Sequence, residues 1–186
     1  MHRPRHSLIA HPSNRPSANL TVAASVGYDG VGGLDLRFRV CGTGGALRLP
    51  APAAPRREDG LWRHTCMEAF VGVAGSASYR EFNFSPSGCW AAYGFSATRC
   101  RDDFDVETPC HCTCGPLPDG FALEAVIPAA WLPAGASLTV ALSTVLEADD
   151  GTLGYWALRH PPGQPDFHWP GARCLTLPDV NREERG

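Results

Sequence analysis

The sequence predicts an all-β protein, an antiparallel β-sandwich with a jelly-roll-like arrangement, from three observations. Short runs such as residues 34–40 and 121–127 alternate apolar and polar side chains, the pattern of a strand with one buried and one wet face. The 20 glycines and 17 prolines fall between such runs, as turns do between strands. No apolar pattern of helical period is long enough to favour an α/β fold.

The expected elements follow in chain order from this pattern. Residues 34–40 are the clearest strand of the N-terminal third. Residues 47–58, rich in Pro, Ala and Arg, predict an irregular excursion that ends in an Asp59-Gly60 turn, and strand pairing resumes near Leu61. The remaining expected strands span residues 65–71, 79–85, 89–95, 121–127, 137–147, 154–158 and 172–177.

Turn and breaker residues connect these strands. The turn at residues 85–88 joins two strands of a meander, and Asp149-Asp150-Gly151 predicts a hairpin turn. Residues 129–132 are expected to make one helical turn. Residues 100–119 are polar and rich in breakers, so a loop or a poor strand is expected there.

Composition favours one domain over residues 1–186, with loose ends at about 1–18 and 179–186. The net charge is -3, and every basic residue is an arginine without forming a patch, which argues against a nucleic-acid partner. The first residues lack the apolar stretch of a secretory signal, and no apolar run approaches the roughly 20 residues that span a bilayer. A cytoplasmic location with reduced cysteines and no membrane contact is expected.

Four runs carry a resemblance to a known family. Residues 61–70 (Leu-Trp-Arg-His-Thr-Cys-Met-Glu-Ala-Phe) and 79–93 resemble the central segment of bacterial DOMON-like proteins. The closing motif of those proteins resembles residues 154–161 (Gly-Tyr-Trp-Ala-Leu-Arg-His-Pro) and 165–168 (Pro-Asp-Phe-His). The resemblance implies a sandwich related to family 9 carbohydrate-binding modules and to haem- or sugar-binding DOMON domains, and it implies no settled biochemical activity.

The central strands contain the first candidate ligand-binding residues. Strand alternation places Glu68 on one face of its strand and Glu81 with Asn83 on one face of the next. If these strands pair, the three polar groups converge beside Trp90 or Tyr93. Carboxylates and an amide near aromatic rings are typical of a sugar-binding site. The alternative is the wet outer face that any alternating strand presents.

The C-terminal loop contains a second cluster of titratable and aromatic residues. Phe167 is expected to be the buried anchor of this loop, because exposing its ring costs about 1.5–3 kcal/mol. A packed corner without a binding role is the alternative. The candidate ligand-binding residues of this cluster are Arg159, His160, Asp166 and His168.

Cofactor and catalytic motifs are weak. A haem alternative would use Met67 with His64, His160 or His168 as axial ligands. Cysteines 100, 110, 112 and 114 lack the spacing of a zinc site, so metal binding is left as unknown, with calcium as an open alternative and no cofactor expected. The sequence contains neither a G-x-S-x-G nor an H-E-x-x-H motif.

These observations favour a binding domain over an enzyme. The expected ligand is a carbohydrate or another small polar molecule. A haem-binding or redox domain is the first alternative, and a domain that binds a protein partner is the second.

Overall fold

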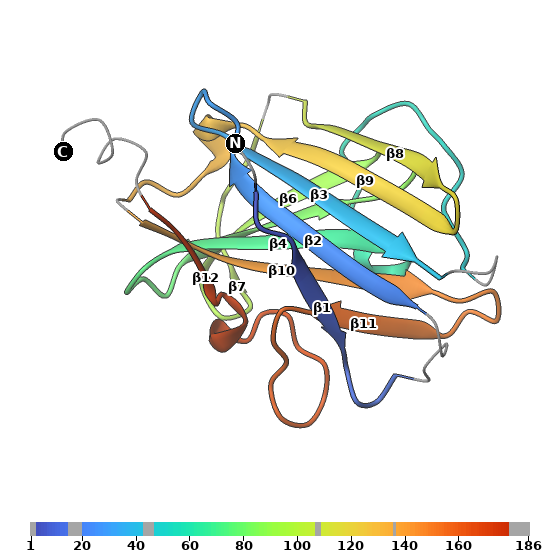
Figure 1. The fold of residues 1–186 in the computed structure, drawn as a ribbon. Coiled ribbons are helices and arrows are strands. Elements are labelled where there is room, and N and C mark those ends of the chain that lie inside the picture. The colour runs from blue at the N-terminus through green and yellow to red at the C-terminus, as the bar shows by residue number, and fades with distance from the viewer. Residues whose placement is uncertain (1–2, 15–19, 43–46, 107–108, 136, 179–186) are drawn as a thin grey trace.

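The computed structural model describes residues 3–14, 20–42, 47–106, 109–135 and 137–178, which form two β-sheets packed face to face (Figure 1). Sheet A has the strand order β1-β2-β3-β9-β8, and sheet B has the order β7-β6-β5-β4-β10-β11-β1, with β12 beside β10. The ladders between these strands are antiparallel, which confirms the predicted sandwich. The strands are β1 His6–Ala10, β2 Thr21–Tyr28, β3 Leu34–Cys41, β4 Cys66–Val73, β5 Tyr79–Phe84, β6 Trp90–Ala97, β7 Cys100–Arg101, β8 His111–Leu117, β9 Gly120–Ile127, β10 Ser137–Glu147, β11 Leu153–Ala157 and β12 Leu175–Pro178.

Helical structure in the described residues is limited to three short 3-10 helices, η1 (Leu61–Arg63), η2 (Ala129–Trp131) and η3 (Pro170–Ala172). In this part of the chain, no helix is long and apolar enough to cross a bilayer. The helical turn expected at residues 129–132 is confirmed by η2. The strand expected to resume near Leu61 was wrong, because η1 occupies that position and β4 begins at Cys66.

The main core lies between the two sheets and is built by alternate residues of each strand. Phe38 of β3 and Leu123 of β9 are fully buried from one side, and Phe82 and Met67 are fully buried from the other. Phe82 stacks on Trp131 of η2 with ring centroids 6.3 Å apart. The alternation that predicted strands in the sequence is therefore the alternation that fills this core.

Strand β1 belongs to both sheets. Its first residues, His6 to Leu8, pair with β2 in sheet A, whereas Ile9 and Ala10 pair with β11 in sheet B. The strand thus closes one corner of the sandwich. The expectation that residues 1–18 form a loose end was wrong for this strand, and the loose end expected at residues 179–186 lies outside the described residues.

Most expected strands are confirmed with ends that differ by at most three residues. The sequence prediction missed β1 and β2, although Val22, Ala24 and Val26 of β2 alternate inward in the same way as β3. The hairpin turn at residues 149–151 is confirmed by the hydrogen bond that the Gly151 N–H donates to the Ala148 carbonyl, 2.9 Å.

Residues 100–119 contain a regular edge strand where a loop or a poor strand was expected. Strand β8 pairs with β9 along its whole length, and it accommodates Pro116 because an edge strand has one side without partners. Cys110 and Cys112 are buried, and burial raises the pKa of each thiol to about 12. These cysteines act as small apolar side chains of the core.

Candidate functional site

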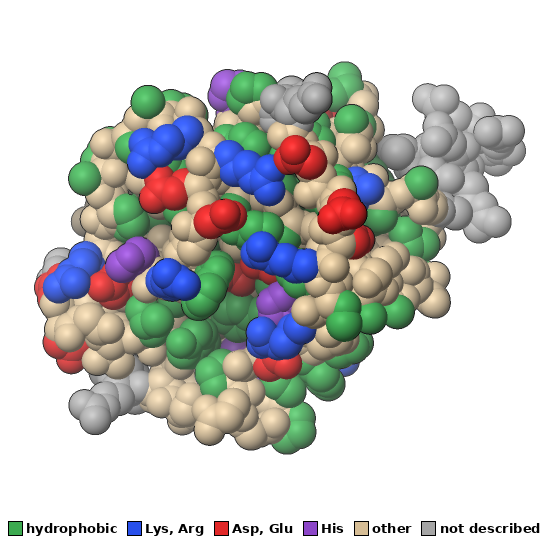
Figure 2. Space-filling model, turned by 180° about the vertical axis from the view of Figure 1, so that it is seen from behind, with side chains coloured by type: hydrophobic (Ala, Val, Ile, Leu, Met, Phe, Trp, Pro, Cys, Tyr) green, Lys and Arg blue, Asp and Glu red, His purple; other side chains and the backbone are tan. Residues whose placement is uncertain are grey.

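A cavity of about 510 Å³ opens on the outer face of sheet B, the face seen in Figure 2. Strands β4, β5, β10 and β11 form its floor. Its sides come from η1, from the hairpin between β6 and β7, and from the loop that follows β11. Figure 2 shows apolar side chains in this hollow, with histidine at its centre and arginines around it.

The floor brings together the three polar residues of the central strands. Glu68 of β4 lies opposite Asn83 of β5 in the ladder, and the Asn83 Nδ2 donates to Glu81 Oε1 at 2.8 Å. The exposed fractions of Glu68, Glu81 and Asn83 are 3%, 5% and 0%. The expected convergence is confirmed. The alternative of a wet outer face was wrong, because the C-terminal loop and η1 cover this part of the sheet.

Burial controls the charge of this floor. The pKa of Glu68 is raised well above its usual value, first by burial and then by the nearby Glu81 carboxylate. Burial also raises the pKa of Glu81, and the Asn83 hydrogen bond and the Arg101 charge oppose this shift. No described residue hydrogen-bonds to the Glu68 carboxyl, which lines the cavity. Glu68 is therefore a buried acceptor available to a ligand.

His168 anchors the C-terminal loop on this floor. Its Nδ1 lies 2.7 Å from Tyr79 Oη, and that oxygen accepts the Arg99 backbone N–H at 3.1 Å. The hydrogen bonds are satisfied when the Tyr79 hydroxyl donates to an unprotonated Nδ1 of His168. The imidazole proton is then on Nε2, which lies 3.6 Å from Glu81 Oε2. The imidazole packs edge-on against Phe70 and Phe95, and burial lowers its pKa to about 4.

Phe167 shares the anchoring of the C-terminal loop with His168. Its ring is only partly buried, lines the cavity and lies edge-on to Tyr155 with centroids 6.0 Å apart. The expectation of Phe167 as an anchor is confirmed in part, because its ring packs against the apolar cluster on this face of sheet B, and His168 anchors the same loop. Asp166 Oδ1 accepts the His168 backbone N–H at 3.0 Å, and this bond stabilises the turn that carries both side chains.

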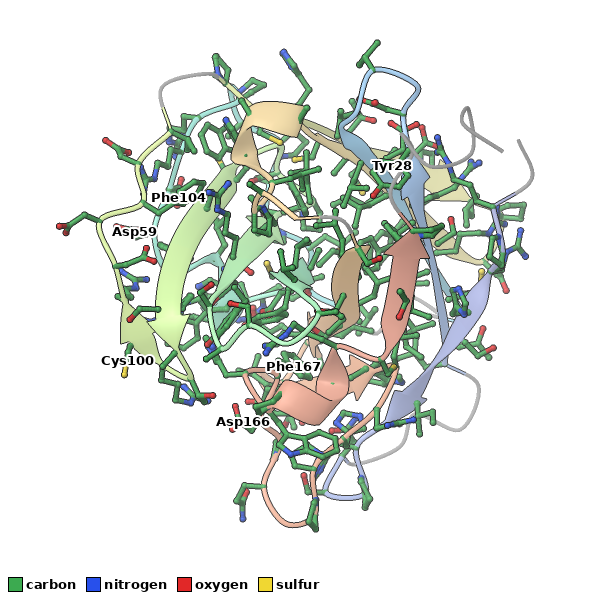
Figure 3. All side chains as sticks on the ribbon, turned by 90° about the vertical axis from the view of Figure 1, so that its left-hand side faces the viewer. Tyr28, Asp59, Cys100, Phe104, Asp166 and Phe167 are labelled. Carbon is green, nitrogen blue, oxygen red and sulfur yellow. The ribbon has the colours of Figure 1, made fainter. Side chains whose placement is uncertain are left out.

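Asp166 joins the loop to the hairpin between β6 and β7. Its Oδ1 accepts a hydrogen bond from Arg99 Nη2 at 2.7 Å. Figure 3 shows Asp166 and Phe167 on the C-terminal loop, with Cys100 of the hairpin at the far left.

Arg101 lies over the Tyr93 ring, 4.0 Å from its centroid, and Tyr93 donates to Asp59 Oδ1 at 2.8 Å. Tyr93 thus supports the cavity wall from beneath.

Three sequence candidates lie away from the cavity. Trp90 points to the opposite face of sheet B and packs against Trp131 in the core, 5.0 Å between centroids. The expectation that Trp90 lies beside the acids was wrong, because Glu81 pairs with Tyr93 and residue 90 therefore has the other orientation. Arg159 is exposed, and His160 Nε2 lies 2.7 Å from the Ile9 carbonyl near β1.

Several cavity residues were not recognised in the sequence. Trp62 of η1 is 45% exposed at the rim, and the Arg63 guanidinium lies 5.1 Å from its ring centroid. Arg99, Arg101 and Tyr155 also line the cavity. Trp62 and Tyr155 lie within the runs that resemble DOMON-like proteins, and this was the available signal for them. No sequence pattern indicated that Arg99 and Arg101 line the cavity, because the hairpin between β6 and β7 brings them there.

Residues considered for haem or metal are separated in the fold. Met67 is fully buried on the core side of β4, whereas His168 lies on the outer side of sheet B and His64 is exposed. Among the described residues, no group of three or more His, Cys, Asp or Glu side chains is arranged to hold a metal ion.

Comparison with solved structures shows which fold this is. A protein from Bacteroides uniformis that is provisionally assigned to carbohydrate binding matches 91% of this chain and 84% of its own, with a TM-score of 0.65 and 16% identity. A family 9 carbohydrate-binding module from Caldicellulosiruptor kristjanssonii matches in complexes with cellotriose (84% and 74%, TM-score 0.55, 10% identity) and glucose (80% and 72%, 0.55, 11%). The chain has the β-sandwich fold of these modules. No family model and no curated protein sequence matches it.

Proposed function

We propose that the chain is a non-catalytic domain that binds a carbohydrate in the cavity on sheet B. The observation that carries this proposal is the pairing of aromatic rings at the rim with buried carboxyl groups on the floor. Trp62, Tyr155 and Phe167 offer apolar faces, and Glu68 and Glu81 offer acceptors. Solved proteins of the same fold hold glucose and cellotriose, which supports a sugar as the ligand.

The chemistry of a sugar fits this arrangement. A pyranose ring has apolar C–H faces that pack on aromatic rings and a belt of hydroxyls that need acceptors and donors. The Glu68 carboxyl accepts hydrogen bonds from sugar hydroxyls, and the rim arginines donate hydrogen bonds to hydroxyl oxygens. A volume of about 510 Å³ accommodates one or two hexose units rather than a long chain.

We also propose that the chain is DOMON-like and cytoplasmic. The runs that resemble DOMON-like proteins supply several residues around the cavity. Residues 61–70 contain Trp62 and Glu68, and residues 79–93 contain Glu81 and Asn83. The closing motif contains Tyr155 in residues 154–161 and His168 in residues 165–168. The shared positions of motif and cavity support the resemblance. Separating cytoplasmic from exported protein in the source cells, with an antibody against the chain, tests the location.

Replacing Trp62 with alanine should weaken sugar binding about two- to tenfold, because stacking on an aromatic ring contributes about 0.5–1.5 kcal/mol. Titration calorimetry with glucose, galactose, xylose and cellotriose measures the affinity of each variant. The melting temperature should change little, since Trp62 is 45% exposed. Val126→Ala, an exposed residue of β9 in sheet A, is the control and should bind as the unmodified protein does. Failure of all four sugars to bind, or full affinity in Trp62→Ala, would contradict the proposal.

A further inference from the structure

We propose that the sugar bound in this cavity carries an anionic group, a carboxylate or a phosphate, and that Arg101 binds that group on the hairpin that Arg99 holds in place. This inference rests on the proposed function and names the class of sugar. Both arginines come from the hairpin between β6 and β7, and both line the same cavity.

The backbone of Arg99 is held in an unfavourable conformation. Its φ is 59°, the only positive φ at a non-glycine position among the described residues. Left-handed backbone costs a side-chain-bearing residue about 1–2 kcal/mol, and glycine would avoid this cost. The conformation directs the Arg99 N–H to Tyr79 Oη and its guanidinium to Asp166 Oδ1. The Arg99–Asp166 ion pair therefore ties the hairpin to the C-terminal loop, and this hairpin holds Arg101 at the cavity.

Arg101 presents a charge that the protein leaves without a carboxylate partner. Among the described residues, no Asp or Glu lies within ion-pair distance of its guanidinium, which rests over the Tyr93 ring at 4.0 Å. Arg63 is held in the same manner over Trp62. An aromatic face orients a guanidinium without neutralising it. Two of the three cavity arginines are therefore positioned and still free to bind an anion.

The charge balance of the cavity favours an anion over a neutral ligand. Three arginines line the cavity with three acids, Asp166, Glu68 and Glu81. The pKa values of both glutamates are raised by burial, so the floor carries less negative charge than two free carboxylates would. At the hairpin, Arg99 is paired with Asp166, whereas no Asp or Glu among the described residues lies within ion-pair distance of Arg101. Planar guanidinium groups suit carboxylate and phosphate oxygens, to which they donate two parallel hydrogen bonds.

Matched pairs of sugars test this inference by calorimetry. Glucose is compared with glucuronate and with glucose 6-phosphate, and galactose with galacturonate. At least one anionic sugar should bind tenfold or more tightly than its neutral partner. The difference should shrink to less than threefold in Arg101→Gln and in 0.5 M salt, because rim charges are screened. Arg37→Gln, on an exposed arginine of sheet A paired with Glu124, should keep the full difference.

The outcomes separate this inference from the proposed function. A gain for glucose 6-phosphate alone identifies a sugar phosphate, and a gain for uronates alone identifies a sugar acid. If neutral sugars bind through Trp62 and no anionic sugar binds more tightly, the anionic class is overturned and sugar binding stands. A difference that persists in Arg101→Gln, with an unchanged melting temperature, also overturns it. If no sugar binds, both proposals are overturned.

Discussion

Replacing His168 with alanine should lower the free energy of unfolding by about 3 kcal/mol, or roughly 6–12 °C in melting temperature for a chain of this size. The change removes the hydrogen bond with Tyr79 and two edge-on ring contacts, with Phe70 and Phe95. A buried hydrogen bond contributes about 1 kcal/mol and each ring contact about 0.5–1.5 kcal/mol. Thermal and denaturant unfolding measure the loss.

Companion variants separate the anchor from the ligand-facing ring. Phe167→Ala should lower stability less than His168→Ala does, while weakening sugar binding, because the phenyl ring lines the cavity and makes no hydrogen bond, whereas the imidazole is hydrogen-bonded to Tyr79. His111→Ala, at an exposed position of β8, is the control and should stay within about 0.5 kcal/mol of the unmodified protein. A larger loss for Phe167→Ala than for His168→Ala would reverse this assignment.

The His168 interaction should also depend on pH. Its pKa is lowered from 6.5 to about 4 in the folded protein, so the unfolded chain takes up the proton first as the pH falls. The stability that the neutral imidazole contributes is complete above pH 6.5 and is lost as the pH falls toward 4. His168→Phe keeps the ring packing and should remove this part of the pH dependence. Melting curves of both proteins between pH 4 and 8 measure it.

Replacing Glu68 with glutamine should stabilise the protein at neutral pH and impair binding. Its raised pKa means that the folded state retains a proton that the unfolded chain releases near 4.5. Below that pH both proteins carry a neutral group and should be equally stable. As the pH rises, the unmodified protein should lose stability relative to Glu68→Gln, on the order of 1–3 kcal/mol for a buried charge without partners.

The same substitution should weaken sugar binding about two- to tenfold, because the amide replaces one carboxyl oxygen by an NH2 group and a neutral hydrogen bond contributes about 0.5–1.5 kcal/mol. Calorimetry at pH 7.5 measures this loss, and melting curves from pH 4 to 8 measure the stability. Glu124→Gln on the exposed surface of β9 should change neither quantity. An equal stability difference at every pH would show that Glu68 titrates as an ordinary carboxyl.

Much of sheet A could be predicted because its strands β3 and β9 bury one regular face. Strand β3 is an example, since Leu34, Leu36 and Phe38 enter the core in strict alternation. Strand β8 could not be predicted in the same way. Its one buried residue is Cys112, and its exposed positions include Gly115 and Pro116, which are depleted in strands. Its extended conformation is stabilised by the hydrogen-bonded ladder with β9, which the composition of β8 does not indicate.

The candidate site could be predicted only where its residues share one ladder. Glu68, Glu81 and Asn83 lie on adjacent strands joined by a short connection, so alternation was sufficient to bring them together. Trp90 was misplaced because the turn at residues 85–88 determines the register of β6, and a register shifted by one residue reverses the face. Trp62 and Arg101 reach the cavity from segments that contact it only in the folded protein.

The shared strand β1 has a consequence for the order of folding. Ile9 pairs with Ala157, and this ladder cannot form on the ribosome before residue 157 has been synthesised. Closing so long a segment is entropically expensive and slow compared with the hairpins of sheet B. Until β1 docks, β11 has an unpaired edge that is open to pairing with another chain. The corner that β1 closes is thus protected from aggregation only once two segments far apart in the sequence have met.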